Sequence, residues 1–478
     1  MSKKLRAFTL LLCLFLGTTS SRSQELVSAE LVFEYSTFVI GFFGSPAPND
    51  YPVNFYKITY TTTDTDGQPT VASGAVTIPI TEECNTFPMT AYCHGTVLRR
   101  LDVPSERNLE STIITGLSSA GYIGLAPDYL GLGEDEGVHP YVHAESQATA
   151  TLDMISATRE FLETTDVQDN GQVFITGYSQ GGHAAMAALK YAQDNNLVDE
   201  MGIAGGAPLS GPYDMSGSQA NLILSDEPYS TPGYVIYLLV SYQSVYGNLY
   251  NELSDVIIEP YATEVAPYFD GVQNEFSMSV VNDILPDNID EFMRDSVLTN
   301  FENNPNHPLR VALADNDLFD WAPNFPLRMY YCDADEQVAF TNSTTTEQIM
   351  ITNGATDVGS SNVLPGANHG GCVLPAIEAT YNFFETIALE CTNILTTNEE
   401  SSNNLNVWPN PANTIIQMEF SEEIELVSLF DLNGRLVKQE IVNAQRHVLN
   451  TTDLAIGNYI LVINQKDQPY RKLISIQR

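Results

Sequence analysis

A serine between two glycines stands where the chain changes from one kind of local structure to another. Residues 175–185 read ITGYSQGGHAA, which places Ser179 in the spacing Gly-x-Ser-x-Gly. The β-branched residues before the turn predict a buried strand, and the alanine-rich residues after it predict a helix. Gly177 and Gly181 let the backbone turn sharply without a Cβ clash. The alternative without a catalytic role is an ordinary strand-to-helix turn. The context favours an exposed nucleophile, so we predict that role for Ser179.

A serine hydroxyl needs a base that takes its proton and a carboxylate that orients the base. These groups commonly follow the nucleophile in the order acid, then histidine. Two histidines lie well beyond the turn. His307 precedes the strand expected at 327–332, whereas His369 follows that strand in a Gly-rich loop. We therefore assign the base to His369.

The acid is expected directly after the same strand, where the chain reads YYCDADEQV. Asp333 and Asp335 compete for this role. We favour Asp335, because it precedes the Glu-x-Val pattern that is usual after such an acid. Asp333 and Glu336 are expected to be solvated loop charges.

The negative charge that develops on a carbonyl oxygen during attack needs preorganised N–H donors. One is expected to be the backbone N–H of Gln180, directly after the nucleophile. The other is expected from the sequence His94-Gly95-Thr96, which follows the third predicted strand. Gly95 permits a close approach of the backbone, and the N–H of Thr96 is the candidate donor.

Two further histidines have a spacing that metal ligands can adopt. His139 and His143 stand four residues apart, but Pro140 interrupts any helix between them and no His-Glu-x-x-His motif is present. We predict neither a metal nor another cofactor. His183 is expected to pack beneath the turn that carries Ser179.

Strand-like and helix-like runs alternate from about residue 55 to 390, which favours a mostly parallel α/β sheet. Asp66-Gly67 predicts a hairpin between the runs at 55–60 and 71–80. Val363-Leu364 is expected to be the remains of a last strand. The other expected strands are 87–93, 122–126, 172–179, 203–208 and 327–332, and the expected helices include 105–120 and 148–162.

The interval from about 211 to 326 is too long for a normal connection, so we predict an inserted helical cap. Five of its tyrosines fall largely on one helical face: Tyr234, Tyr237, Tyr242, Tyr246 and Tyr250. We favour packing inside the cap as their role. The alternative is the wall of a pocket for an acyl or aromatic group.

Acidic residues dominate most of the chain, whose formal net charge is −40. Residues 25–404 hold 9 Lys and Arg against 52 Asp and Glu, whereas residues 405–478 hold 7 against 8. So uneven a balance predicts two separate modules. The acidic part would repel nucleic-acid phosphates, so no nucleic-acid partner is expected.

Four segments follow from composition and pattern. Basic residues followed by an apolar run predict a secretory signal peptide at 1–24. Residues 25–395 are the expected catalytic domain, and 396–404 the expected polar linker. Residues 405–478 show short alternating strands with turns expected at Asn433-Gly434 and Gly457-Asn458, which predicts a small, sandwich-like all-β domain.

Export makes disulfides possible in this chain. Five cysteines lie beyond the signal peptide, and this odd number leaves at least one of them free or paired with another chain. The sequence leaves their pairing open. They are Cys84, Cys93, Cys332, Cys372 and Cys391.

Several stretches together resemble the secretory lipase family of α/β-hydrolases over roughly residues 50–390. They read AYCHGT, RRLDVPSERN, APDYLGLG, LDMISATRE and ITGYSQGGHAAMAALKY. The resemblance implies hydrolysis of carboxylic esters on a capped α/β-hydrolase fold, with Ser179, Asp335 and His369 as the triad. The cap is the least similar part.

The C-terminal stretches VWPNPANTIIQMEF, FDLNGRLVKQ and LNTTDLAIGNYILVI resemble the type A sorting domain of the type IX secretion system. That resemblance implies a bacterial protein which the signal peptide takes across the inner membrane. The sorting domain would then engage the secretion machinery for passage of the outer membrane. We therefore expect a secreted or cell-surface protein.

The leading functional hypothesis is a secreted esterase or lipase that works through an acyl-enzyme. Two alternatives stay open at this point. A serine peptidase uses the same fold and triad, and Arg99 and Arg100 after the oxyanion loop could bind a charged peptide terminus. A surface-binding module on a dead hydrolase scaffold is opposed by the complete set of serine, acid and histidine. The natural ester, its chain length and the oligomeric state are left open.

Overall fold

The computed structural model describes residues 26–225, 227–389, 391, 405–431, 436–465 and 468–478. By its internal contacts the chain divides into two compact units, one ending at Asn393 and one beginning at Ile394. The signal peptide and the linker expected from the sequence lie outside the described residues. No helix in the described part of the chain is long and apolar enough to cross a membrane.

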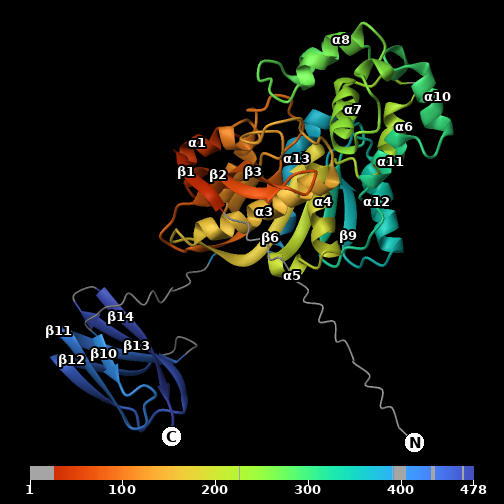
Figure 1. Ribbon diagram of the computed structural model, residues 1–478. Helices are drawn as coiled ribbons and strands as arrows, with labels where there is room; N and C mark the ends of the chain where they lie inside the picture. The colour runs from red at the N-terminus through yellow and green to blue at the C-terminus, as the bar shows by residue number, and fades with distance from the viewer. Residues whose placement is uncertain (1–25, 226, 390, 392–404, 432–435, 466–467) are drawn as a thin grey trace, which may run out of the picture. The chain divides into compact units, whose positions relative to one another are not determined.

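The first unit is built on one nine-stranded sheet (Figure 1). Its strand order is β1-β2-β3-β5-β4-β6-β7-β8-β9, and the strands from β5 to β9 run parallel. The parallel strands therefore end at one common edge. The bounds are β1 Leu26–Tyr35, β2 Val53–Thr63, β3 Pro69–Pro79, β4 Thr86–Cys93, β5 Ile123–Pro127, β6 Gln168–Tyr178, β7 Ile203–Leu209, β8 Leu327–Tyr331 and β9 Val358–Asn362.

The three antiparallel strands at one side of the sheet confirm the predicted hairpin and add a strand. β2 pairs with β3 in the register expected for a turn at Asp66-Gly67. The edge strand β1 was not predicted, because its side chains are exposed on both faces and its sequence shows no alternation. The last strand was placed wrongly: β9 precedes Val363-Leu364, and its sequence VGSSN is too polar to reveal a strand.

Helices cover both faces of this sheet. Successive residues of β6 show why: Val173 and Ile175 pack with α3 and α4 on one face, and Phe174 packs with α13 on the other. The expected long helix at 105–120 is instead a 3₁₀ turn, Pro104–Glu106, followed by a shorter helix. The bounds are α1 Thr37–Gly41, α2 Ser111–Ser119, α3 Ala144–Leu162, α4 Gln180–Asp194, α5 Val198–Met201, α12 Thr341–Thr352 and α13 His369–Glu385.

Between β7 and β8 the described chain forms helices and turns but no strand, and these helices lie together beside the sheet (Figure 1). They have an apolar core of their own, separate from the two cores of the sheet. The main helices are α6 Ala220–Ile223, α7 Gly233–Tyr246, α8 Tyr261–Val265, α9 Met278–Ile284, α10 Asp295–Asn303 and α11 Pro308–Asp315. We call this segment the cap.

The second unit is an antiparallel all-β structure, as the sequence predicted. The turn expected at Asn433-Gly434 lies outside the described residues. Gly457 does not form a turn with Asn458 but opens a strand. The bounds are β10 Leu405–Trp408, β11 Ile415–Asp431, β12 Leu436–Asn450, β13 Gly457–Gln465 and β14 Gln468–Ile476.

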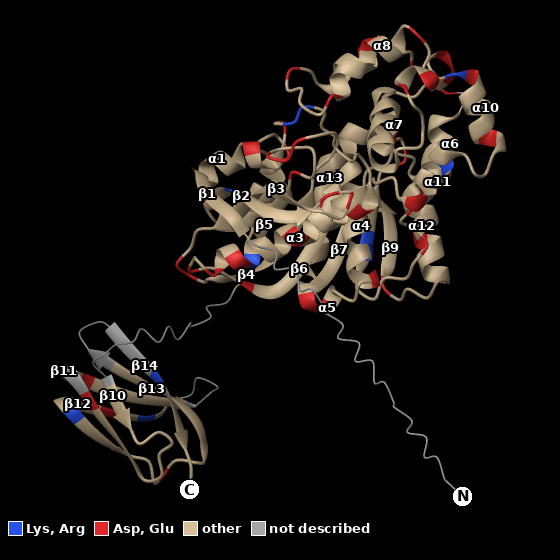
Figure 2. Ribbon diagram, viewed as in Figure 1, with Lys and Arg blue, Asp and Glu red and all other residues tan. Residues whose placement is uncertain are grey.

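The structure decides the pairing of the cysteines. Cys84 is bonded to Cys391, which joins the start of β4 to the segment after α13. Cys332 is bonded to Cys372, which joins the end of β8 to the first turn of α13. Cys93 is a buried free thiol, and burial raises its pKa to about 12. Acidic side chains are spread over the sheet helices and the cap of the first unit, where basic ones are few (Figure 2).

Candidate active site

The turn between β6 and α4 holds Ser179 in a strained conformation. Its φ of 62° and ψ of −121° lie in a region that residues with a side chain rarely adopt. The two neighbouring glycines are required, because a Cβ on Gly177 or Gly181 would collide with the carbonyl oxygen of Cys93 at the end of β4. The turn is therefore packed directly against the end of the neighbouring strand, and Ser179 lies at the sheet edge where the parallel strands end.

His369 and Asp335 come together at the same edge. His369 begins α13, after β9, and Asp335 lies in the loop after β8. The Nδ1 atom of His369 is 2.7 Å from Oδ2 of Asp335, and both residues are buried. The other oxygen, Oδ1, accepts hydrogen bonds from the backbone N–H groups of Gln337 and Val338. The ring of His369 lies 5.0 Å from that of Tyr178, the residue before Ser179.

Two neighbours of Asp335 were expected to be solvated loop charges; Asp333 is exposed as expected, whereas Glu336 is only partly exposed, and both make hydrogen bonds to the histidine segment. Glu336 accepts a hydrogen bond from the backbone N–H of His369, at 3.1 Å. Asp333 accepts one from the N–H of Gly366, at 2.7 Å, and this bond lowers its pKa. The Cys332–Cys372 disulfide adds a covalent link between the same two segments. The loop that carries the acid is therefore tied at four points to the segment that carries the histidine.

The two predicted N–H donors are free to receive an oxyanion. In the described part of the chain, the backbone N–H groups of Gln180 and Thr96 have no hydrogen-bond partner. Gly95 contributes no donor, because its N–H is bonded to the carboxylate of Glu110 at 2.8 Å. The same carboxylate accepts a hydrogen bond from the hydroxyl of Tyr92. Sequence reasoning missed Glu110, whose role depends on the folded position of α2.

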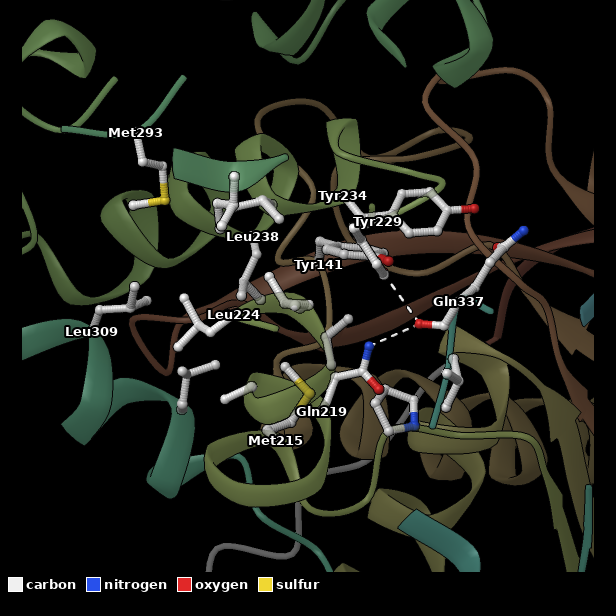
Figure 3. A pocket seen from close by; sticks show the side chains of 18 of the residues that line it. Tyr141, Met215, Gln219, Leu224, Tyr229, Tyr234, Leu238, Met293, Leu309 and Gln337 are labelled. Atoms are coloured by element: carbon white, nitrogen blue, oxygen red, sulfur yellow. Dashed lines mark hydrogen bonds between the residues drawn. The ribbon is translucent and has the colours of Figure 1, made fainter. Parts of the chain in front are cut away.

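An apolar cavity opens from Ser179 into the cap, and the empty space within it, counted together with the solvent at its mouth, is about 870 Å³. Near the serine it is lined by polar groups, and Figure 3 shows the hydroxyl of Tyr229 and the amide of Gln219 both directed to the carbonyl of Gln337. Its far part is apolar and comes from the cap; the lining residues there include Leu224, Leu238, Met293, Val297, Leu298, Phe301, Leu309 and Leu313. The cavity can hold an alkyl chain with its polar end at Ser179.

Only one tyrosine of the predicted stripe lines this cavity. Tyr234 does so, whereas Tyr237 and Tyr242 are buried in the core of the cap. Tyr246 bonds to Asp315, and Tyr250 lies beyond the end of α7. Packing is therefore the main role of the stripe.

The remaining candidates from the sequence have structural partners. His183 is fully buried beneath the turn of Ser179. His143 caps the N-terminus of α3, and burial lowers its pKa to about 4. Arg99 pairs with Asp102 at 2.5 Å, and Arg100 donates to the carbonyl of Gly133. Because both arginines are engaged within the chain, neither favours a site for a charged peptide terminus.

The doubly covered parallel sheet, the strained turn after β6 and the inserted cap define an α/β-hydrolase. Residues 103–370, more than half of the chain, match the family model described as secretory lipase. The chain belongs to the secretory lipase family. Residues 406–477 match the model described as the secretion system C-terminal sorting domain.

Solved structures agree with this placement. The rice cell wall degrading esterase LipA from Xanthomonas oryzae is 29% identical, with a TM-score of 0.67 over 76% of this chain and 97% of that one. A putative hydrolase from Legionella pneumophila is 23% identical, with a TM-score of 0.70 over 76% and 98%. Candida antarctica lipase A in its closed state is 16% identical, with a TM-score of 0.58 over 77% of this chain and 84% of that one. The similarity to the Legionella hydrolase and to the Candida lipase shows the fold alone. No curated protein matches the chain.

These findings confirm the predicted fold class and both resemblances. The protein is an ester hydrolase. It is secreted or held at the cell surface, and it is exported by the type IX secretion route.

Proposed function

We propose that the protein cleaves carboxylic esters through a triad of Ser179, His369 and Asp335 and a covalent acyl-enzyme. The observation that carries this proposal is the placement of a strained serine at the mouth of an apolar cavity, at the same sheet edge as a histidine bonded to a buried carboxylate. Each group has the chemistry that its step requires.

In the first half of the reaction, His369 takes the proton from the Ser179 hydroxyl while the serine oxygen attacks the ester carbonyl. The backbone N–H groups of Gln180 and Thr96 stabilise the resulting oxyanion. When the tetrahedral species collapses, His369 gives its proton to the leaving alcohol. Asp335 accepts a hydrogen bond from Nδ1 throughout, which keeps the Nε2 atom available for proton transfer.

In the second half, His369 removes a proton from water, and the resulting hydroxide attacks the acyl carbonyl. Collapse returns the proton to Ser179 and releases the carboxylic acid. The same two N–H groups stabilise the second oxyanion. No cofactor enters either half.

We assign the acyl group of the ester to the apolar cavity. A chain that leaves water for this cavity gains about 0.8 kcal/mol for each buried CH₂ group. The polar lining near Ser179 suits the ester end, and the apolar lining in the cap suits the alkyl end. The esterase activity named for the relative from Xanthomonas oryzae supports an ester substrate.

The test compares triad variants of the full mature chain on p-nitrophenyl butyrate. Ser179→Ala and His369→Ala are each expected to lower kcat by at least 1000-fold, with unchanged circular dichroism. Asp335→Asn is expected to lower it by about 10⁴-fold, because an amide stabilises the wrong tautomer of His369. Asp333→Asn is the matched control and should keep most of the activity.

A p-nitrophenyl ester series beside peptide anilides separates the proposal from the peptidase alternative. Ester turnover without anilide turnover supports the proposal. If Ser179→Ala retains activity, the nucleophile is wrong, and if Asp333→Asn is the damaging change, the acid is wrong.

We further propose four functional parts: a signal peptide at 1–24, the catalytic domain at 25–395, a linker at 396–404 and a sorting domain at 405–478. The match of residues 406–477 to the sorting-domain model supports binding of this last part to the secretion machinery. The boundary of the two compact units at residues 393 and 394 supports independent folding of the catalytic part.

A further inference from the structure

The two residues whose N–H groups face the proposed oxyanion have side chains that bond to one short segment. The amide Nε2 of Gln180 is 2.7 Å from Nε2 of His139. The hydroxyl of Thr96 is 3.0 Å from that of Tyr141. His139 and Tyr141 are alternate residues of the loop after β5, and both are buried. One loop therefore contacts both walls of the oxyanion site.

The orientation of the Gln180 amide is fixed by the chemistry of His139. The Nδ1 atom of His139 lies 2.7 Å from the carbonyl of Leu130, which can only accept, so Nδ1 carries the proton. Its Nε2 atom is then an acceptor, and the Gln180 amide must present its N–H₂ group. Burial lowers the pKa of His139 to about 3, so the ring stays neutral at ordinary pH.

The same loop is held from the other side by helix α7 of the cap. The hydroxyl of Ser241 donates to the carbonyl of His139 at 2.6 Å. The ring of Tyr237 stacks on that of Tyr141, with the centroids 4.5 Å apart and the planes 6° from parallel. Tyr242 donates to the carbonyl of Val142 at 3.1 Å. Cap, loop and oxyanion donors thus form one continuous set of buried contacts.

We propose that His139 and Tyr141 are positioning residues that hold the two oxyanion donors in place and make their geometry depend on the docked cap. Tyr141 lines the cavity beside Ser179, but neither side chain takes part in the bonds that form and break. Their effect passes through Gln180 and Thr96, whose backbone N–H groups must point to one oxygen. This inference rests on the proposed function, since it concerns the oxyanion of that reaction.

The principal test measures full-chain Tyr141→Phe on p-nitrophenyl butyrate and with butylboronic acid, which forms a tetrahedral adduct on a serine. Loss of the hydroxyl leaves the stacked ring in place but frees Thr96. We expect kcat to fall about tenfold with KM within twofold, since removal of a donor outright costs 10²–10³-fold. The Ki of butylboronic acid should rise by the factor by which kcat/KM falls.

A double-mutant cycle decides whether Tyr141 works through Thr96. Thr96→Val keeps the backbone N–H and the shape of the side chain but removes its hydroxyl. If the two hydroxyls act as a pair, the variant with both changes is no worse than the poorer single variant. Effects that multiply would overturn the proposed route.

The His139 side is tested in the same way by His139→Phe, which keeps a ring between its neighbours and removes the acceptor for Gln180. Gln180→Met removes the other partner and serves if the first variant does not fold. Each should lower kcat and weaken butylboronic acid in parallel. Weakened stability with an unchanged Ki would show that His139 is merely structural.

Two serine variants on helix α7 test whether the cap holds the loop in place. Ser241→Ala removes the bond to His139 and is expected to lower kcat threefold or more on an ester too short to fill the cavity. Ser244→Ala, on the same helix, removes only a bond within α7 and should leave kcat unchanged. Equal activity of the two variants would show that the cap does not hold the site.

Tyr60→Phe controls for the loss of one buried tyrosine hydroxyl, since Tyr60 bonds to Ala150 away from the site. It should lower the melting temperature without changing kcat. Ser179→Ala separates the two proposals. If Ser179→Ala is inactive while Tyr141→Phe matches the wild type, only the positioning role fails; if Ser179→Ala is active, the proposed function itself fails.

Discussion

Two adjacent acidic residues accept hydrogen bonds from His369, one from its ring and one from its backbone. Asp335 accepts from the ring, and Glu336 accepts from the backbone N–H of the same residue. Two adjacent residues of one loop therefore contact two different atoms of His369. A carboxylate that faces a backbone N–H at the start of α13 is also favoured by the helix dipole.

The role of Glu336 is tested by two replacements. Glu336→Ala removes the acceptor, so His369 gains freedom, and kcat should fall about three- to tenfold with KM unchanged. Glu336→Gln keeps an oxygen at the same position and should restore most of kcat. Steady-state kinetics on p-nitrophenyl butyrate give both values. If the glutamine variant is as poor as the alanine variant, the charge and not the hydrogen bond matters.

Buried histidines make the folded protein sensitive to acid. Burial lowers the pKa of His143 to about 4, below the value of about 6.5 expected for the unfolded chain. As the pH falls through 6.5, the unfolded state binds a proton at this histidine, but the folded state does not bind one until the pH nears 4. The free energy of unfolding therefore decreases. Burial raises the pKa of Asp128, so this residue has the opposite effect: its contribution to the free energy of unfolding increases as the pH falls.

The change His143→Asn isolates one of these groups. Between pH 7 and pH 5, His143 should account for a loss of about 2 kcal/mol in the free energy of unfolding. Urea unfolding at the two pH values should therefore show a smaller loss in His143→Asn than in the wild type. An equal loss in both proteins would contradict the lowered pKa.

At the scale of elements, helices α6, α7, α10 and α11 of the cap each present a face that lines the cavity. α11 shows this division clearly: Leu309 and Leu313 line the cavity, whereas Val311 between them is 55% exposed. The spacing of four residues places the two leucines on one face of the helix. The element therefore supplies a wall on one side and solvent-facing residues on the other.

This division predicts the effect of filling the cavity. Met293→Trp adds bulk at the apolar end, far from Gln337 in Figure 3. The ratio of p-nitrophenyl laurate to p-nitrophenyl butyrate turnover should fall at least tenfold, because the long acyl chain loses its site while the short one keeps its own. Val311→Trp, on the outer face of α11, is the control and should keep the wild-type ratio. A ratio unchanged in Met293→Trp would place the acyl chain elsewhere.

At the scale of the whole molecule, two compact units differ in charge, in fold and in family. The last described residue of the first unit is Cys391, and its disulfide to Cys84 spans 307 residues of the chain. Closing so long a loop restricts the unfolded chain strongly. The first unit is thereby closed covalently just before the expected linker.

Two truncations test this division. A chain that ends at Asn404 should keep the kcat/KM and melting temperature of the full chain, since every proposed site residue and both disulfides remain. A chain that ends at Leu389 loses the Cys84–Cys391 bond, which should cost on the order of 3–5 kcal/mol in the free energy of unfolding. Thermal unfolding and ester kinetics measure both. Loss of activity in the longer truncation would mean that the second unit completes the site.

Export provides the other test of the second unit. In a host with type IX secretion, the full chain should reach the medium or the cell surface, and the chain that ends at Asn404 should stay in the periplasm. Immunoblots of the fractions distinguish the two locations. Normal export of the truncated chain would contradict a sorting role for residues 405–478.

The sequence by itself determined whatever depends on near neighbours or on chain order. The strained turn of Ser179 follows from two glycines between a strand and a helix, and the choice of His369 over His307 follows from the order of elements. The alternating pattern was enough for the α/β class, because buried strands and covering helices have distinct periods. The roles of Ser179, His369 and Asp335 remain predictions.

Only the tertiary structure decided what depends on distant partners. Glu336 and Asp333 lie in a polar loop, and only the folded chain brings the N–H groups of His369 and Gly366 to them. The bonds from Thr96 to Tyr141 and from Gln180 to His139 join residues about 40 positions apart, a distance over which local pattern carries no information. The same holds for the disulfides and for the polar strand β9, because hydrogen bonds and packing between distant segments form only when the chain has folded.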